Sequence, residues 1–167
     1  MADISVQSSV TTGGKKQSKV FNVKDASGML DSDTKNLLLF MHAFGGCDTT
    51  SAIFDKGKST VKNLLEKSAE AKNLAKEFMN PNAEQELIGQ AGIKLFVLLY
   101  GGKQGDTLEV LRYSNYMKMA AVSPKIVPAK LPPTERAAYF HSLRVYLQVK
   151  LSYFAQMYII ALRFGSG

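Results

Sequence analysis

The spacing of apolar residues is the feature that most constrains how this chain can fold. Between residues 34 and 164, apolar side chains recur at intervals of three and four in one segment after another, which is the pattern of amphipathic helices. Glycine pairs, an Asn-Pro pair or a proline-rich stretch separate these segments and are typical helix breakers. The pattern predicts a mainly α fold, a single helical domain of five or six helices with at most one or two short N-terminal strands.

The predicted helices cover residues 34–44, a segment from about 59, 69–79, 83–100, 106–120 and 134–164. We expect Asp33 to cap the first of them, Asp106 or Thr107 the fifth and Thr134 the last. The stretch 122–134 holds four prolines and should be a connector. Glycines should weaken the helix at 83–100. The predicted core residues are Leu37, Leu38, Phe40, Met41, Phe44, Val61, Leu64, Leu65, Leu74, Phe78, Leu87, Ile88, Leu95, Leu98 and Leu99.

The N-terminal segment has a different composition. Residues 1–19 are rich in Ser, Thr, Gly and Lys, so we expect a flexible lead-in, followed by the helical domain at 20–164. Val20 and Val23 favour one short strand just after the lead-in. The final Gly-Ser-Gly at 165–167 is interpreted as an added tail.

The net charge is +7, with 21 Lys and Arg against 14 Asp and Glu. From Lys118 onward the only acidic residue is Glu135, so the excess of positive charge lies in the C-terminal third. Such a balance favours polyanionic partners. A basic face kept for solubility explains the charge about equally well.

The compartment is indicated by two negative observations. A single cysteine cannot form an internal disulfide, and the longest apolar stretch, from Leu151, is interrupted by Gln156 and Arg163 and is shorter than the roughly 20 residues of a membrane-spanning helix. We therefore expect an intracellular protein with no membrane partner.

The segment "HAFGGCDTTSAIFDKGKST" at 42–60 is the most suggestive for binding. Its Gly57-Lys58-Ser59 matches the end of a nucleotide-binding phosphate loop, but Ala52 replaces the first glycine of that motif and no buried strand precedes it. The same residues at a helix start would instead offer free N–H groups, a positive helix end and two lysines to one backbone phosphate. An ordinary cap by Ser59 with solvated lysines fits the local pattern at least as well. The residues of this predicted backbone-binding turn are Lys56, Gly57, Lys58, Ser59 and Thr60.

Asp48 is the candidate metal ligand. A carboxylate after a glycine turn can bind Mg²⁺, but two-metal hydrolysis needs several converging carboxylates. The alternative is an N-cap with Thr49 and Thr50 in the first helical turn. Cys47 and His42 lack an orienting partner for nucleophilic catalysis, and His141 is expected on an amphipathic helix face.

Two sequence blocks carry a family resemblance. The block "GCDTTSAIFDKGKSTVKNLL" resembles a segment of flap-endonuclease-like, PIN-type nucleases. In this chain the block is followed by "KLFVLLYG" and then by "LPPTERAAYFHSLRVYLQV". This order of segments resembles a group of uncharacterised, transposon-associated animal proteins with a divergent domain of that kind. The similarity runs from about Lys15 to Val149. It implies that Asp48 is a metal-binding aspartate and that Gly57, with Lys56 and Lys58, is the DNA-backbone turn.

The same resemblance also implies an N-terminal truncation. Proteins of that family carry further metal-binding carboxylates on an upstream sheet, and in this chain only Asp3 could correspond to one of them. The tryptophan-containing segment that usually follows in the family is also missing after Val149. The resemblance therefore implies a nuclear, DNA-backbone-binding remnant that is catalytically incomplete and requires no cofactor, with Mg²⁺ as an optional ion.

Two other functions stay open. One is an active Mg²⁺-dependent endonuclease completed by Asp31, Asp33 or a partner chain. The other is a helical protein-interaction module that forms homo-oligomers or binds a protein through the aromatic C-terminal helix. The aromatic residues of that helix are Tyr139, Phe140, Tyr146, Tyr153, Phe154 and Tyr158.

Overall fold

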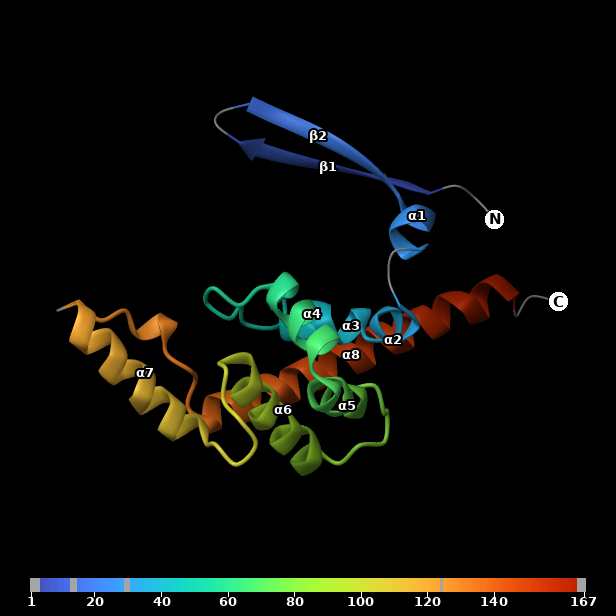
Figure 1. Cartoon of the computed structure of the whole chain (residues 1–167). Coiled ribbons are helices and arrows are strands. Elements are labelled where there is room, and N and C mark those ends of the chain that lie inside the picture. The colour runs from blue at the N-terminus through green and yellow to red at the C-terminus, as the bar shows by residue number, and fades with distance from the viewer. Residues whose placement is uncertain (1–3, 13–14, 29–30, 124, 165–167) are drawn as a thin grey trace. The chain divides into compact units, whose positions relative to one another are not determined.

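The computed structural model describes residues 4–12, 15–28, 31–123 and 125–164. Helices make up most of the described chain, and strands occur only near its N-terminus (Figure 1). The predicted mainly α fold class is confirmed. The chain divides into two compact units, Met1–Asn36 and Leu37–Gly167. The domain boundary expected after residue 19 falls within a strand, and the expected tail at 165–167 lies outside the described residues.

The first unit contains an antiparallel hairpin. Strand β1 (Ser5–Thr12) pairs with β2 (Lys15–Asn22), with Ser5 opposite Asn22. The segment expected as a lead-in at 1–19 thus contains β1 and the start of β2, and the prediction of at most one or two short N-terminal strands is confirmed. The polar composition concealed a strand pattern, because Val and Thr recur among its serines and favour extended backbone.

Two short helices follow β2 in the first unit. Helix α1 spans Val23–Gly28, so Val23 begins a helix rather than continuing the strand predicted there. Helix α2 spans Ser32–Asn36. Asp31, not Asp33, caps α2, because the Asp31 carboxylate accepts a hydrogen bond from the Thr34 N–H at 2.9 Å. Asp33 already lies in the first turn of α2, where its backbone is helical.

The second unit begins with α3 (Leu38–Phe44) and continues with α4 (Lys58–Lys67) and α5 (Ala69–Glu77). The predicted helix at 34–44 is thus two helices, with Leu37 between them. Ser68 separates α4 from α5 and caps α5 by accepting a hydrogen bond from the Ala71 N–H at 3.1 Å.

Helices α6 (Gln85–Leu99), α7 (Leu108–Val122) and α8 (Glu135–Phe164) complete the second unit, with the short 3-10 helix η1 (Pro128–Lys130) in the connector. Of the two candidates to cap α7, the structure selects Thr107, whose hydroxyl accepts from the Val110 N–H. The predicted cap of α8 is confirmed, because Thr134 Oγ1 accepts from the Ala137 N–H. None of the helices described has the combined length and apolarity that crossing a membrane requires.

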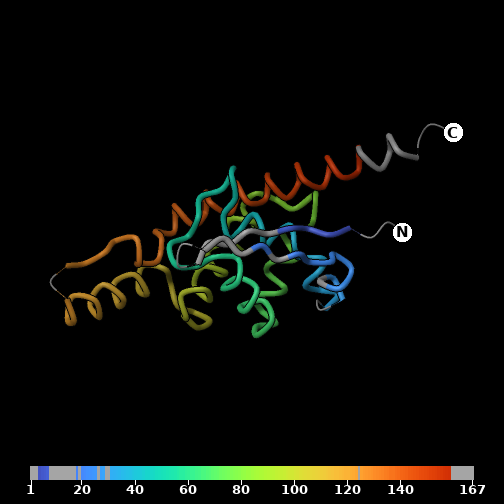
Figure 2. The backbone as a smooth tube through the Cα atoms, turned by 90° about the horizontal axis from the view of Figure 1, so that it is seen from above, coloured from blue at the N-terminus to red at the C-terminus, as the bar shows by residue number. Residues whose placement is uncertain are grey.

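The core lies where α3, α5, α6 and α8 meet, and Figure 2 shows α8 running along this group. At its centre the Phe40 ring lies 5.1 Å from that of Phe44 and 4.9 Å from that of Phe78, and Phe96 lies 5.0 Å from Phe44. Most of the predicted core is confirmed. Leu38 and Leu87 are the exceptions, with exposures of 47% and 48%, because each lies one position off the buried face of its helix.

The glycines of α6 have a packing role that the sequence did not reveal. A Cβ atom on Gly89 would lie 2.0 Å from the Tyr139 ring, and one on Gly92 would lie 1.7 Å from Ser142 Oγ. Residues 89 and 92 therefore form a notch, one turn apart, against which α8 packs. This close approach explains why the helix accepts two poor helix formers.

Candidate functional site

The loop between α3 and α4 holds most of the predicted site residues, and its path depends on one glycine. Gly46 has φ +97°, and a Cβ atom there would lie 2.7 Å from Ala52 Cα. A side chain at this position would be both strained and blocked by backbone. Glycine at 46 thus lets the loop fold back on itself directly after α3.

Residues 47–50 then form a tight turn. The Cys47 N–H donates to the Thr50 carbonyl and the Thr50 N–H donates to the Cys47 carbonyl, at 3.3 and 3.2 Å. Asp48 is exposed at the corner of this turn. It is not an N-cap, since the next helix begins only at Lys58. Within the described ranges, no group of three or more His, Cys, Asp or Glu side chains could hold a metal ion, and metal binding by Asp48 stays a prediction.

Two threonines hold the turn in place. The buried Thr50 hydroxyl donates to the Ala43 carbonyl at 2.6 Å and accepts from the Cys47 N–H. Thr49 Oγ1 donates to Gln148 Oε1 of α8 at 2.6 Å. The turn is therefore anchored both to the end of α3 and to α8. Neither contact could be predicted from local spacing in the sequence.

Cys47 lies between these two hydroxyls, with its Sγ 3.3 Å from each. Partial burial raises the pKa of the thiol, whereas hydrogen bonds from Thr49 and Thr50 lower it, to about 7. The backbone N–H groups of Thr49 and Thr50 also act to lower the pKa of the thiol. Each hydroxyl has a single hydrogen, and Gln148 and the Ala43 carbonyl accept these hydrogens at short distances. We therefore infer that competition for the hydroxyls limits how far the pKa falls.

The predicted backbone-binding turn lies at the start of α4. Gly57 is the N-cap, no side chain caps the helix, and the Gly57 carbonyl accepts from the Thr60 and Val61 N–H groups. The N–H groups of Lys58 and Ser59 are first-turn donors, which have no acceptor within their own helix. A Cβ atom on Gly57 would meet nothing within 4 Å. The five predicted residues are thus brought together at an open helix end.

The side chains of Lys56 and Lys58 make different contacts. Lys58 is exposed, and its Cγ would lie 3.0 Å from a Cβ atom on Gly45, so its stem packs over the end of α3. The Lys56 ammonium lies 5.3 Å from the centre of the Tyr100 ring, a cation–π contact. Asp55, with φ 53°, precedes Lys56 in a left-handed conformation that Asp adopts more readily than most residues.

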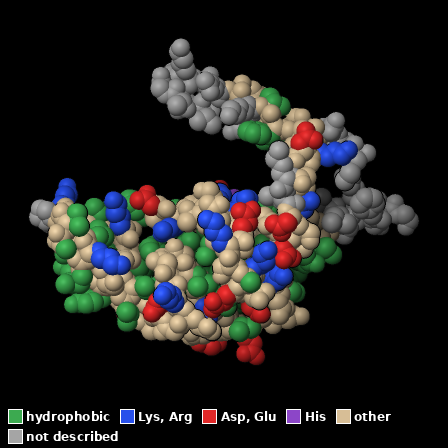
Figure 3. All heavy atoms as spheres, viewed as in Figure 1, with side chains coloured by type: hydrophobic (Ala, Val, Ile, Leu, Met, Phe, Trp, Pro, Cys, Tyr) green, Lys and Arg blue, Asp and Glu red, His purple; other side chains and the backbone are tan. Residues whose placement is uncertain are grey.

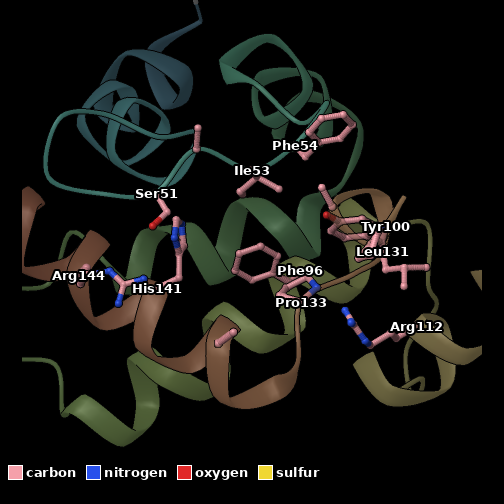
Figure 4. A pocket seen from close by; sticks show the side chains of 14 residues that line it. Ser51, Ile53, Phe54, Phe96, Tyr100, Arg112, Leu131, Pro133, His141 and Arg144 are labelled. Atoms are coloured by element: carbon pink, nitrogen blue, oxygen red, sulfur yellow. The ribbon is translucent and has the colours of Figure 1, made fainter. Parts of the chain in front are cut away.

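Tyr100 also lines a cavity of about 380 Å³ beneath residues 51–54, bounded by α6, α7, α8 and the connector (Figure 4). Phe96 and Ile53 form apolar walls of the cavity, and Arg112 and Arg144 contribute guanidinium groups. Arg112 Nη1 donates to the buried Pro132 carbonyl. Burial raises the pKa of the Tyr100 hydroxyl, and the positive charge of Arg112 partly offsets this, so the hydroxyl keeps its proton near neutral pH.

His141 forms part of the same cavity wall but belongs to the core. Its side chain is 5% exposed, and its ring lies edge-on to Phe44 and Phe96. Nε2 lies 3.2 Å from the Phe44 carbonyl and must donate to it, since a carbonyl can only accept. Burial lowers the pKa of His141 to about 4, although the bond to Phe44 acts in the opposite sense. The expected amphipathic-face residue is therefore a neutral core histidine.

On the face of the molecule shown in Figure 3, positive charge is not concentrated, because Lys and Arg side chains are interspersed with Asp and Glu. The ion pair found among the described residues joins Lys62 to Glu66, so within that part of the chain neither the lysines of the turn nor the two arginines of the cavity are neutralised by a carboxylate.

Sequence reasoning missed the cavity. Ser51, Tyr100, Arg112 and Arg144 come from four separate segments, and no local spacing links them. The available signal was weak: Arg112 and Arg144 each lie on a helix with few acidic residues close by.

Comparisons with protein-family models, curated proteins and solved structures found no match to this chain. The similarity to flap-endonuclease-like domains thus stays a prediction from the two sequence blocks.

Proposed function

We propose that the helical unit binds the backbone of nucleic acid at the start of α4, as a catalytically incomplete, flap-endonuclease-like domain with a nuclear role. The observation that carries the proposal is the open end of α4, where Gly57 leaves space and Lys56 and Lys58 stand on either side. First-turn N–H groups together with lysine ammonium groups suit a phosphate oxygen. Such contacts position a protein on nucleic acid without reading bases.

The geometry also predicts how much each of the two lysines contributes to the affinity for nucleic acid. Lys58 is exposed and free to reach a phosphate, whereas Lys56 is half-buried against Tyr100. A cation–π contact at such a site contributes only about 0.5–1 kcal/mol, so Lys56 can exchange the ring for a phosphate at small cost. Lys58 should therefore supply the larger part of the affinity.

The test compares DNA binding by the unaltered protein and by Lys56→Glu/Lys58→Glu over a series of salt concentrations. We expect the double variant to lose at least about tenfold in affinity and to show a shallower dependence of log K on log salt, by about two phosphate contacts. The matched control is Lys118→Glu/Lys125→Glu, which makes the same charge change at exposed positions elsewhere. Equal losses of affinity in both double variants would show that binding depends only on net charge, and would overturn the proposal.

Hydrolysis is examined with the same samples. DNA cleavage that requires Mg²⁺ and disappears in Asp48→Ala would assign an active nuclease in place of a binding remnant. Binding without cleavage is the result that the proposal expects.

A second candidate function is supported by the exposed side of α8. Leu147, Leu151, Phe154 and Tyr158 are 55–65% exposed and follow one another at spacings of four, three and four, the repeat of a coiled-coil seam. Tyr146, one of the aromatics expected to bind a partner, is instead buried and donates its hydroxyl to the Asn80 carbonyl at 2.8 Å. The candidate interface therefore excludes Tyr146, whereas Phe140 and Tyr153 are exposed beside this stripe at 47% and 46%.

Sedimentation equilibrium tests the second candidate. Self-association that is lost in Leu151→Glu/Phe154→Glu and kept in the exposed control Ala155→Glu/Gln156→Glu would support a helical interaction module. A protein that stays monomeric at all concentrations would exclude self-association through this stripe.

A further inference from the structure

The cavity beneath residues 51–54 differs from the open end of α4 in having walls as well as charge. Its volume of about 380 Å³ falls within the range of sites that enclose small ligands. Phe96 and Ile53 provide apolar surface, and Tyr100 and Phe54 add aromatic rings at one side (Figure 4). A flat or branched apolar body would be well accommodated between these side chains.

The charged groups of the cavity are of one sign. Arg112 and Arg144 lie toward opposite ends with Phe96 between them, as Figure 4 shows, and Ser51 adds a hydroxyl. No Asp or Glu is among the described residues that line the cavity. Cationic ligands and metal ions would find only like charge there.

Arg112 is the better-prepared of the two arginines. It is half-buried, and its Nη1 donates to the Pro132 carbonyl, which fixes the guanidinium before any ligand arrives. A guanidinium has five N–H donors, so several remain for an anionic head group. Donors fixed in advance lose little entropy on binding.

We propose that this cavity is a binding site for a small organic anion, with an apolar ring or branched body between Phe96 and Ile53 and a carboxylate or phosphate head group on Arg112. Arg144 and Ser51 hold a second polar group of the ligand at the opposite end. The two arginines and the apolar walls of this site are distinct from the turn at the start of α4, although Tyr100 lines the cavity and also contacts the Lys56 ammonium. Either head group fits the planar fork of an arginine, and the experiment distinguishes the two sources.

The direct test follows NMR signals of the unaltered protein during titration with three probes of one shape: naphthoate, naphthyl phosphate and the uncharged naphthalenemethanol. We expect the two anions to shift the methyl signals of Ile53 and Leu131 and the ring signals of Phe96, and to bind at least about tenfold more tightly than the alcohol. The tighter of the two anions identifies the head group. Equal binding of all three probes, or shifts that avoid these residues, would overturn the proposal.

Variants then assign the head group to its arginine by calorimetry. Arg112→Gln should weaken the anions by about tenfold while leaving the alcohol within about twofold, and Arg144→Gln should weaken them less. Arg136→Gln is the matched control, because Arg136 is exposed and does not line the cavity. Arg112→Lys keeps the charge but not the planar fork and should recover only part of the affinity. Unchanged anion binding in both Arg112→Gln and Arg144→Gln would contradict the assignment.

Discussion

Gly92 of α6 approaches Ser142 of α8 so closely that a Cβ atom on residue 92 would lie 1.7 Å from Ser142 Oγ. The serine cannot easily move aside, because it is fully buried and its hydroxyl donates to the Ala138 carbonyl at 2.7 Å. The two helix backbones are therefore held together at a distance that only glycine permits.

Gly92→Ala should destabilise the protein although alanine is the better helix former. Alanine gains about 1 kcal/mol in helix propensity, but the added methyl group must push α8 away, at a cost that exceeds this gain. We expect a net loss of about 2 kcal/mol in the free energy of unfolding, measured by urea denaturation. Lys94→Ala, at an exposed position of the same helix, should change stability by less than about 0.5 kcal/mol. A more stable Gly92→Ala protein would show that the notch is not close-packed.

His141 should make stability depend on pH. Because burial lowers its pKa to about 4 from about 6.5 in the unfolded chain, the unfolded state binds more protons between these values. The stabilisation is thus complete above about pH 6.5 and is lost as the pH falls toward 4, by about 2 kcal/mol between pH 7.5 and 5.

The measurement is urea unfolding of the unaltered protein and of His141→Gln at several pH values. The glutamine amide nitrogen lies near the position of the imidazole Nε2, so it can still donate to the Phe44 carbonyl, and it does not titrate. The unaltered protein should lose more stability than the variant over this range, and parallel pH profiles would argue against a neutral, buried imidazole.

Thr50→Val should loosen the turn before α4. The valine has nearly the shape of threonine but leaves the Ala43 carbonyl without the hydroxyl bonded to it at 2.6 Å. The carbonyl still accepts from the Gly46 N–H at 3.3 Å, so the expected loss is that of one hydrogen bond, about 0.5–1.5 kcal/mol. The neighbouring Thr49→Val is the control, since the Thr49 side chain is exposed. Similar, small losses of stability in the two variants would mean that water replaces the hydroxyl of Thr50.

Gln148→Ala should lower the pKa of Cys47. Once Gln148 Oε1 is gone, the Thr49 hydroxyl has its hydrogen available for the sulfur 3.3 Å away, and a hydrogen bond to a thiolate favours ionisation. The pH dependence of alkylation reports this directly, because the chain has one cysteine. Ser152→Ala, which leaves the bond between Thr49 and Gln148 intact, should not shift the profile. A profile unmoved by Gln148→Ala would show that the Thr49 hydroxyl does not reach the sulfur.

The sequence was informative wherever a property depends on local spacing. The helices from residue 58 onward, the cap at Thr134 and the buried face containing Phe40 and Phe44 follow from periodicity and hydrogen-bonding chemistry. The hairpin was missed because its strands are mostly polar and their pairing, Ser5 with Asn22, is not local.

The candidate site residues likewise divide into those that local spacing predicts and those that it does not. Lys56 to Thr60 lie together because they are consecutive, and their proximity needed no tertiary information. The cavity joins Arg112 of α7 to Arg144 of α8 only through the packing of these helices with α6 and the connector. The role of Gly92 was likewise invisible, because the residue that requires it is Ser142, fifty positions later.

The notch between α6 and α8 has a consequence for how the cavity could change over evolution. Phe96 lies one turn beyond Gly92, and His141 adjoins Ser142. The cavity wall formed by Phe96 and His141 is therefore fixed by the contact between the backbones of α6 and α8. Ser51, Ala129 and Ala137 line the same cavity from exposed positions, where substitutions cost little stability. Mutations at the rim could therefore alter ligand preference while the frame stays constant, which would let such a pocket diversify faster than the fold that carries it.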